Sequence, residues 1–169
     1  KKYQSMNETL KEYSGFIHHA AEIYDANDAQ LAAMAAALGV NPKRPVRPVQ
    51  GGIFTNTHGE GHNGIDLALP AGSPIVAAVG GTVITDSNDG SQNDGYGNFV
   101  KILGDDGNTY YYAHMSNTAD RADGSRVEPG EVIGYVGSTG NSTGNHLHFE
   151  IRDPDGRQLN PEEVHPDIW

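Results

Sequence analysis

The first part of the chain carries the hydrophobic spacing of helices. From Met6 to Tyr24, apolar or small residues recur at intervals of three and four, which places them along one stripe of a helix. A second helix is indicated between Asp28, a favourable N-cap, and Gly39, a typical C-terminal stop. We therefore expect a short α-helical hairpin over residues 1–41.

After a Pro/Gly-rich segment, the pattern changes to that of short strands. Residues 42–52 contain three prolines and two glycines, which continue neither helix and indicate a linker. Beyond it, β-branched and aromatic runs alternate with Gly, Asp and Asn clusters, which predicts a mainly β domain of antiparallel strands over residues 53–169. The clearest hairpin is expected around GDDGN, where Asp106-Gly107 favours a tight turn. The expected strands lie in the runs PIVAAV, GTVIT, FVKIL, TYYYAH, VIGYV and HLHFEIR.

Composition narrows the classes of partner. With 169 residues, 36% of them apolar, the chain can bury one good core. Its formal net charge of -11 argues against a nucleic acid or an anionic membrane surface, because both would be repelled. The longest apolar stretch, LAAMAAALGV, is too short to span a bilayer, so we expect no membrane insertion. Because the chain begins with Lys, we expect a mature product or a piece of something longer.

Two short motifs contain the candidate metal-ligating residues. In NHLHFE, His146 and His148 are two residues apart in an apolar run, so on a strand they project from the same face. Upstream, HNGID offers His62 and Asp66 next to glycines that allow tight turns. The chain has no cysteine, so any zinc must be held by His, Asp or Glu. His62, Asp66 and one histidine of the HxH pair would give the three protein ligands typical of a catalytic zinc site.

Each of these elements is weak when taken alone. A single histidine is more often structural or exposed than a metal ligand, and His114, at the end of an aromatic strand, could simply pack against tyrosines. The HxH pair is more specific, because burying two imidazoles without partners is costly. The remaining histidines are interpreted as solvated or structural; they are His18, His19, His58 and His165.

Two glycine-containing loops can be considered as sites for calcium or phosphate. The thirteen-residue segment DSNDGSQNDGYGN has the Asp and Asn content of a calcium loop, but Gly90 and Gly97 stand where acidic ligands are needed, so a solvated loop beside a site is preferred. The run GSTGNSTG lacks the lysine of a phosphate-binding loop and precedes no helix. It is better interpreted as a tight connection that orients the HxH strand.

The ordered motifs HNGID, YAHM, GSTGNSTGNHLHFEI and NPEEV resemble those of the M23 zinc endopeptidases of the lysostaphin and LytM type. The similarity extends to connecting segments and runs from Pro45 to about Pro161, and it does not include residues 1–40. Members of this family cut peptide bonds in bacterial peptidoglycan. The resemblance thus implies an antiparallel β catalytic domain and hydrolysis of peptide cross-links or cross-bridges.

Carried over position by position, the resemblance implies that His62, Asp66 and His148 bind Zn²⁺. It implies that His114 and His146 are catalytic, one of them taking a proton from the attacking water. Spacing does not decide which of the two is the base, and it does not identify the bond that is cut. The expected partners are bacterial peptidoglycan peptides. The expected location is extracellular, in the cell wall or on a phage tail, and we expect a monomer.

Two alternatives compete with this interpretation. The first is a non-catalytic wall-binding or activator module of the same fold, against which stands the presence of all five chemical residues. The second is a cupin-like metal protein, which also uses HxH on a strand. A cupin's acidic ligand is expected further downstream, whereas Glu150 follows His148 by only two residues, and the HNGID motif would have no role. Metal content and a peptide-cleavage assay together separate the three.

Overall fold

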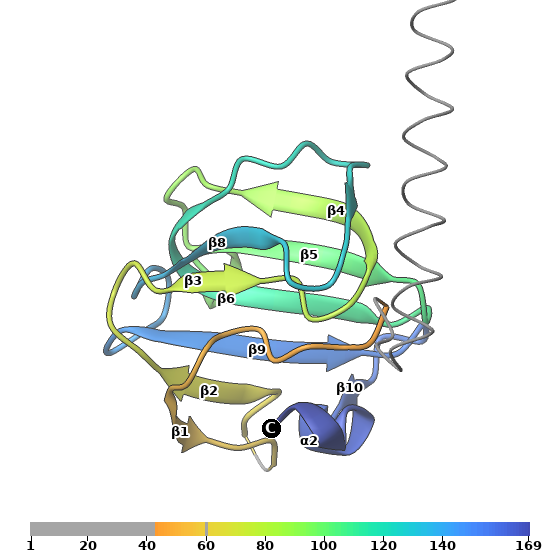
Figure 1. Cartoon of the computed structure of the whole chain (residues 1–169). Helices are drawn as coiled ribbons and strands as arrows, with labels where there is room; N and C mark the ends of the chain where they lie inside the picture. The colour runs from red at the N-terminus through yellow and green to blue at the C-terminus, as the bar shows by residue number, and fades with distance from the viewer. Residues whose placement is uncertain (1–42, 60) are drawn as a thin grey trace, which may run out of the picture. The chain divides into compact units, whose positions relative to one another are not determined.

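The computed structural model describes residues 43–59 and 61–169, so the helical hairpin predicted for residues 1–41 lies outside the described residues. Ten strands form one antiparallel sheet, which confirms the predicted fold class (Figure 1). The strands are β1 (Ile53–Asn56), β2 (Ile65–Ala68), β3 (Pro74–Val76), β4 (Gly81–Ser87), β5 (Asn98–Gly104), β6 (Thr109–Thr118), β7 (Arg126–Val127), β8 (Val132–Val136), β9 (His146–Arg152) and β10 (Gln158–Leu159). The described residues also contain three short helical turns: η1 (Asn93–Gly95), α2 (Pro161–Val164) and η2 (Pro166–Ile168).

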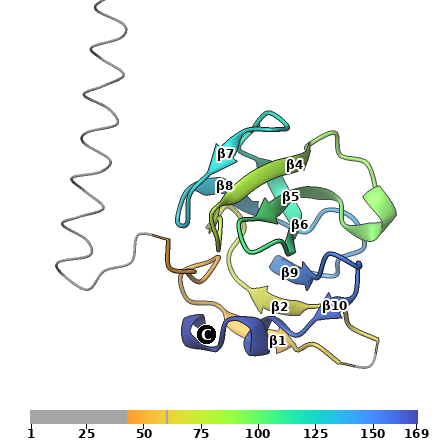
Figure 2. The same ribbon diagram turned by 90° about the vertical axis from the view of Figure 1, so that its right-hand side faces the viewer.

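The main path of the sheet runs β1-β2-β9-β6-β5-β4-β7. Strand β6 pairs with two different strands along its length: its first half pairs with β9, and its second half pairs with β8. Strand β8 also pairs with β3, and Figure 1 shows these two strands next to each other. Figure 2 shows the strands of the main path from the side, with β8 beside them. The centre of the sheet is therefore β9 and β6, with strands on both sides of each.

The core is built by alternation along these central strands. On β9, Leu147, Phe149 and Ile151 are fully buried in one apolar cluster with residues of β2, β3, β6 and β8. The residues between them face the other way, which leaves the polar side chains of the HLHFE run on the opposite face of the sheet. The sequence pattern of β9 thus separates a hydrophobic face from a polar one.

The predicted hairpin turn is found where the sequence places it. The hairpin joining β5 to β6 pairs Leu103 with Thr109 across GDDGN, as predicted. Four strands were not predicted, namely β1, β2, β7 and β10, and each has only two to four residues. Strands this short contain too few alternating apolar and polar residues to be distinguished from the surrounding Gly, Asp and Asn.

Part of the Pro/Gly-rich segment packs onto the sheet. The Val46 amide donates to the Ala78 carbonyl, the Val76 amide donates to the Pro48 carbonyl, and Val49 is 1% exposed within the core. Residues 46–49 therefore contribute to the β structure. Among the described residues, none of the helices has the length and apolar character needed to cross a membrane.

Candidate metal centre

Pairing between β2 and β9 brings the two sequence motifs together. In this register Asp66 lies opposite His148, and Ala68 lies opposite His146. The entry to β2 depends on Gly64, where an added Cβ would come within 2.2 Å of the Phe149 carbonyl oxygen. Just before it, His62 forms a two-way backbone bridge with Gly59, which turns its side chain back over β2.

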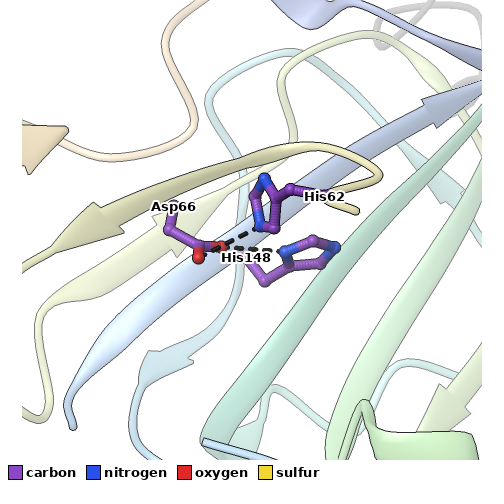
Figure 3. A group of neighbouring side chains, drawn as sticks. All are labelled: His62, Asp66 and His148. Carbon is purple, nitrogen blue, oxygen red and sulfur yellow. Dashed lines mark hydrogen bonds and ion pairs between the residues drawn. The ribbon is translucent and has the colours of Figure 1, made fainter. Parts of the chain in front are cut away.

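His62, Asp66 and His148 form a compact group of possible metal ligands (Figure 3). His62 Nε2 lies 3.1 Å from Asp66 Oδ2, and His148 Nδ1 lies 2.8 Å from Asp66 Oδ1. One ligand atom from each residue lies within 4.8 Å of the other two. Ligands bonded to one tetrahedral zinc ion stand about 3.4 Å apart, so the two nitrogens and one oxygen fit such an ion with small adjustments.

The other two predicted residues line the same cleft. His146 Nε2 is 3.7 Å from Asp66 Oδ1, and the ring of His114 lies 4.7 Å from that of His146, between centroids. The cleft has a volume of about 450 Å³ and is lined by all five predicted site residues. Its walls include residues 94–96 and 141–143, so both glycine-containing loops of the sequence border it.

His114 reaches the cleft through a bulge in β6. Regular alternation would place it with Tyr110 and Tyr112, whose side chains are fully buried in the core. Instead the pairing of β5 with β6 shifts register next to it, and His114 adopts a φ of 61°. A bulge of this kind re-aims a side chain to the other face of a sheet. The sequence predicted His114 as a site residue but gave no indication of this bulge.

Three of the four cleft histidines have their orientation fixed by backbone carbonyls. A carbonyl oxygen only accepts, so each contacting Nδ1 must carry the proton, and Nε2 is left as an acceptor. The three contacts are His62 to Thr57 at 3.1 Å, His114 to Thr139 at 2.8 Å and His146 to Gly144 at 2.8 Å. In the neutral form of each ring, Nε2 is therefore the nitrogen that can accept a metal or a proton.

His148 is oriented the other way round. Its Nδ1 faces Asp66, and its Nε2 lies 3.5 Å from Glu150 Oε2. Burial disfavours the charged ring, yet these two carboxylates raise the pKa of His148 to about 9. In the absence of a metal ion, His148 is thus a cation held between two anions at neutral pH.

The remaining electrostatics support a neutral His114 and a charged Asp66. Burial lowers the pKa of His114 to about 4, an effect that the contact with the Thr139 carbonyl only partly offsets. Burial also acts to raise the pKa of Asp66, but the hydrogen bond from His148 and the neighbouring histidines outweigh it and lower that pKa. At neutral pH the cleft therefore combines a carboxylate with at least one uncharged imidazole.

Sequence reasoning missed two residues beside this group. Glu150 is fully buried and contacts His148, and Tyr96 both lines the cleft and donates its hydroxyl to Glu150 over 2.8 Å. Glu150 shares the strand face of His146 and His148, so the period of two could have indicated it. Tyr96 lies in the loop before β5, 54 residues away from its partner, and nothing in the local pattern marks it.

Comparison with known proteins agrees with the resemblance found in the sequence. The model of peptidase family M23 matches residues 60–161. The DD-carboxypeptidase/endopeptidase Mpg of Neisseria meningitidis is 46% identical over 103 residues, which cover 61% of this chain and 22% of that protein. The peptidoglycan DD-endopeptidase ShyA of Vibrio cholerae is 32% identical over 153 residues, which cover 83% of this chain and 32% of that protein.

The fold is also similar to that of a solved structure. The antimicrobial peptidase lysostaphin from Staphylococcus simulans superposes with a TM-score of 0.61 at 26% identity, over 73% of this chain and 53% of that one. The chain spans about a fifth to a third of the length of the two curated relatives. The matched residues contain the whole His62, Asp66 and His148 group together with His114 and His146. The chain therefore belongs to peptidase family M23, a family of metallopeptidases.

Proposed function

We propose that the chain is a zinc endopeptidase that hydrolyses peptide cross-links or cross-bridges of bacterial peptidoglycan. The observation that carries the proposal is the convergence of His62, Asp66 and His148 on one point of a cleft that also holds His114 and His146. Two imidazoles and one carboxylate form a donor set that suits zinc, and three protein ligands leave a position open for water or substrate.

The residues divide into ligands and proton-handling groups. His62, through Nε2, Asp66, through a carboxylate oxygen, and His148, through Nδ1, would hold the ion. When bound, zinc supplies a Lewis acid that polarises the scissile carbonyl and lowers the pKa of the attacking water to about 7. The charge on Asp66 partly balances the ion and is already favoured by the neighbouring histidines.

The two remaining histidines act on the substrate side. His146 keeps its proton on Nδ1 by donating to the Gly144 carbonyl, so its Nε2 can take a proton from water and later deliver it to the leaving amine. His114 has a pKa of about 4, which makes it a weak base at neutral pH. Its neutral Nε2 serves instead as a hydrogen-bond acceptor that orients the water or the substrate amide.

The substrate assignment rests on the relatives and on the cleft. Both curated relatives are named as peptidases with endopeptidase activity, and one is named for peptidoglycan. Apart from its histidines, the ionisable side chains that line the cleft are the acids Asp66 and Asp94 and the hydroxyl of Tyr96. Of the residues that the structure describes, no lysine or arginine lines the cleft, which suits a neutral or amine-bearing peptide. The proposed site of action is accordingly the bacterial cell wall; an association with a phage tail and a monomeric state stay predictions.

Digestion of purified peptidoglycan tests the proposal. Zinc-loaded protein should release fragments with new peptide amino termini, identified by mass spectrometry, from walls of at least one cross-bridge type. Chelation should stop the release, and added zinc should restore it. Full release by metal-free protein would contradict the zinc mechanism. Tight wall binding by zinc-loaded protein, with no fragment from any wall, would favour the non-catalytic module instead.

A further inference from the structure

Glu150 is a fully buried carboxylate at the centre of the sheet. It lies on β9 opposite Tyr111 of β6, and on the β2 side it adjoins Gly64, where an added Cβ would come within 3.1 Å of the Glu150 Cα. The ring of Tyr96 covers this position from the loop before β5, 5.6 Å from the ring of Tyr111. Burying a carboxylate in this way is costly unless charged or hydrogen-bonding partners compensate it.

Two partners compensate the charge of Glu150. Arg152 Nε donates to Oε1 over 2.5 Å, and the Tyr96 hydroxyl donates to Oε2 over 2.8 Å. Arg152 Nη2 in turn donates to the Tyr96 oxygen over 3.0 Å, which closes the network. The guanidinium also lies 4.7 Å from the ring centroid of Tyr111. The carboxylate is thereby held in one orientation, with Oε2 beside the Tyr96 hydroxyl and His148 Nε2.

The third neighbour of the carboxylate is a proposed metal ligand. His148 Nε2 lies 3.5 Å from Glu150 Oε2, on the side of the ring opposite to Asp66. The other three cleft histidines are oriented by loop or strand-end carbonyls, but His148 is in the middle of β9. Its strand pairs with β2 on one side and β6 on the other, so the nearby carbonyls lie in the plane of the sheet. Only a side chain can hold its second nitrogen.

We propose that Glu150 is a positioning residue for the metal centre, held in place by Tyr96 and Arg152. It accepts the Nε2 proton of His148, which fixes the tautomer and the ring orientation in which Nδ1 is free to bind the ion. The inference rests on the proposed function, because it takes His62, Asp66 and His148 as the zinc ligands. Glu150 itself contacts neither the ion nor the substrate.

The test compares zinc affinity in matched variants of the full chain. Glu150→Gln preserves the size of the side chain but removes its negative charge. The charged carboxylate is the group proposed to accept hydrogen bonds from His148, Arg152 and Tyr96 together. The control is Glu128→Gln. Glu128 also accepts a hydrogen bond from an arginine two residues away, Arg126, over 2.9 Å, but this pair is exposed to solvent. Zinc dissociation constants are measured by competition with a chromophoric chelator. Glu150→Gln should weaken zinc binding by about 10- to 100-fold, and Glu128→Gln should leave it unchanged.

Tyr96→Phe provides a second variant in case Glu150→Gln does not fold. It keeps the ring that packs on Tyr111 and removes only the hydroxyl, so zinc binding should weaken by a smaller but measurable factor. The visible absorption of the cobalt-substituted protein should change in Glu150→Gln and Tyr96→Phe, because it reports the ligand geometry. Wild-type affinity and an unchanged spectrum in whichever variants fold would overturn the inference. A wild-type protein that binds no zinc would overturn the proposed function as well.

Discussion

Two clusters in this domain combine a tyrosine, a carboxylate and a histidine, yet only one of them belongs to a candidate site. Beside the cleft, Tyr96 donates to Glu150, which adjoins His148. At the other cluster, Tyr110 donates to Asp106 over 2.6 Å, and its oxygen lies 2.7 Å from His165 Nε2.

The difference lies in what surrounds the histidine. His148 Nδ1 faces Asp66 and lies near His62, whereas His165 stacks on Tyr110 with ring planes 17° apart. Among residues 43–59 and 61–169, the group around Asp66 is the one set of three side chains that could hold a metal ion together. The same combination of tyrosine, acid and histidine thus lies beside a candidate site only where further possible ligands converge on an open cleft.

Replacing His148 or His165 with Ala, one at a time, should give the largest difference between the two clusters. His148→Ala leaves two ligands, so the protein should lose most of its zinc and its peptidase activity, together with the stability that metal binding adds. His165→Ala should keep one zinc per chain and near wild-type turnover, with a lower melting temperature. Metal analysis, kinetics and thermal unfolding of both variants provide the comparison. Zinc retained by His148→Ala would contradict the ligand assignment.

Within the cleft, His146→Ala should separate proton handling from metal binding. Three ligands remain, so the zinc content should stay near that of the wild type while turnover falls by about 10²-fold or more, the scale of a lost general base. The measurement is metal content and kinetics on one preparation. Zinc loss equal to that of His148→Ala would mean that the two histidines of the HLH motif have no separate roles.

Zinc binding should release a proton from His148. In the metal-free protein its pKa is about 9, raised by Asp66 and Glu150 against the effect of burial, so the ring is protonated at pH 7. The ion must displace that proton, and its affinity should therefore rise about tenfold per pH unit from pH 7 toward pH 9. Calorimetry in buffers of different ionisation enthalpy measures the protons released. An affinity independent of pH over this range would argue against the charged His148.

The smallest effects are expected when the hydroxyl of Tyr96 or of Tyr110 is removed. Tyr110→Phe removes a hydroxyl bonded to Asp106 and His165, which should destabilise the protein by about 1 to 3 kcal/mol without affecting zinc. Tyr96→Phe should instead affect zinc affinity. Denaturant unfolding and zinc titration of the two variants make the comparison, and a zinc defect in Tyr110→Phe would remove the distinction between the clusters.

Much of this organisation follows from short-range sequence patterns. The alternation of HLHFEIR gives both the buried face of β9 and the shared polar face of His146 and His148, because a strand has a period of two. The GDDGN hairpin follows from turn chemistry. The donor types in the sequence suggested His62, Asp66 and one histidine of the HxH pair as a ligand set, but choosing His148 required the family resemblance. The contact itself could not be predicted from local pattern, since the pairing of β2 with β9 joins positions 82 residues apart.

Other features depend on tertiary structure and left no mark in the sequence pattern. His114 faces the cleft because of a bulge, and regular alternation alone would have placed it in the core. Tyr96 takes part only because its loop folds back over Glu150. The prediction of helices over residues 1–41 lies outside the described residues, and the division of the chain into domains stays a prediction.

The most direct test of the account is a crystal structure of the zinc-loaded chain, with the metal located by anomalous scattering at the zinc edge. The account predicts one peak within bonding distance of His62 Nε2, an Asp66 oxygen and His148 Nδ1, with His148 Nε2 facing Glu150. His114 and His146 should border the open position without binding the ion. A peak bound by His146 in place of His148, or located outside the cleft, would contradict it.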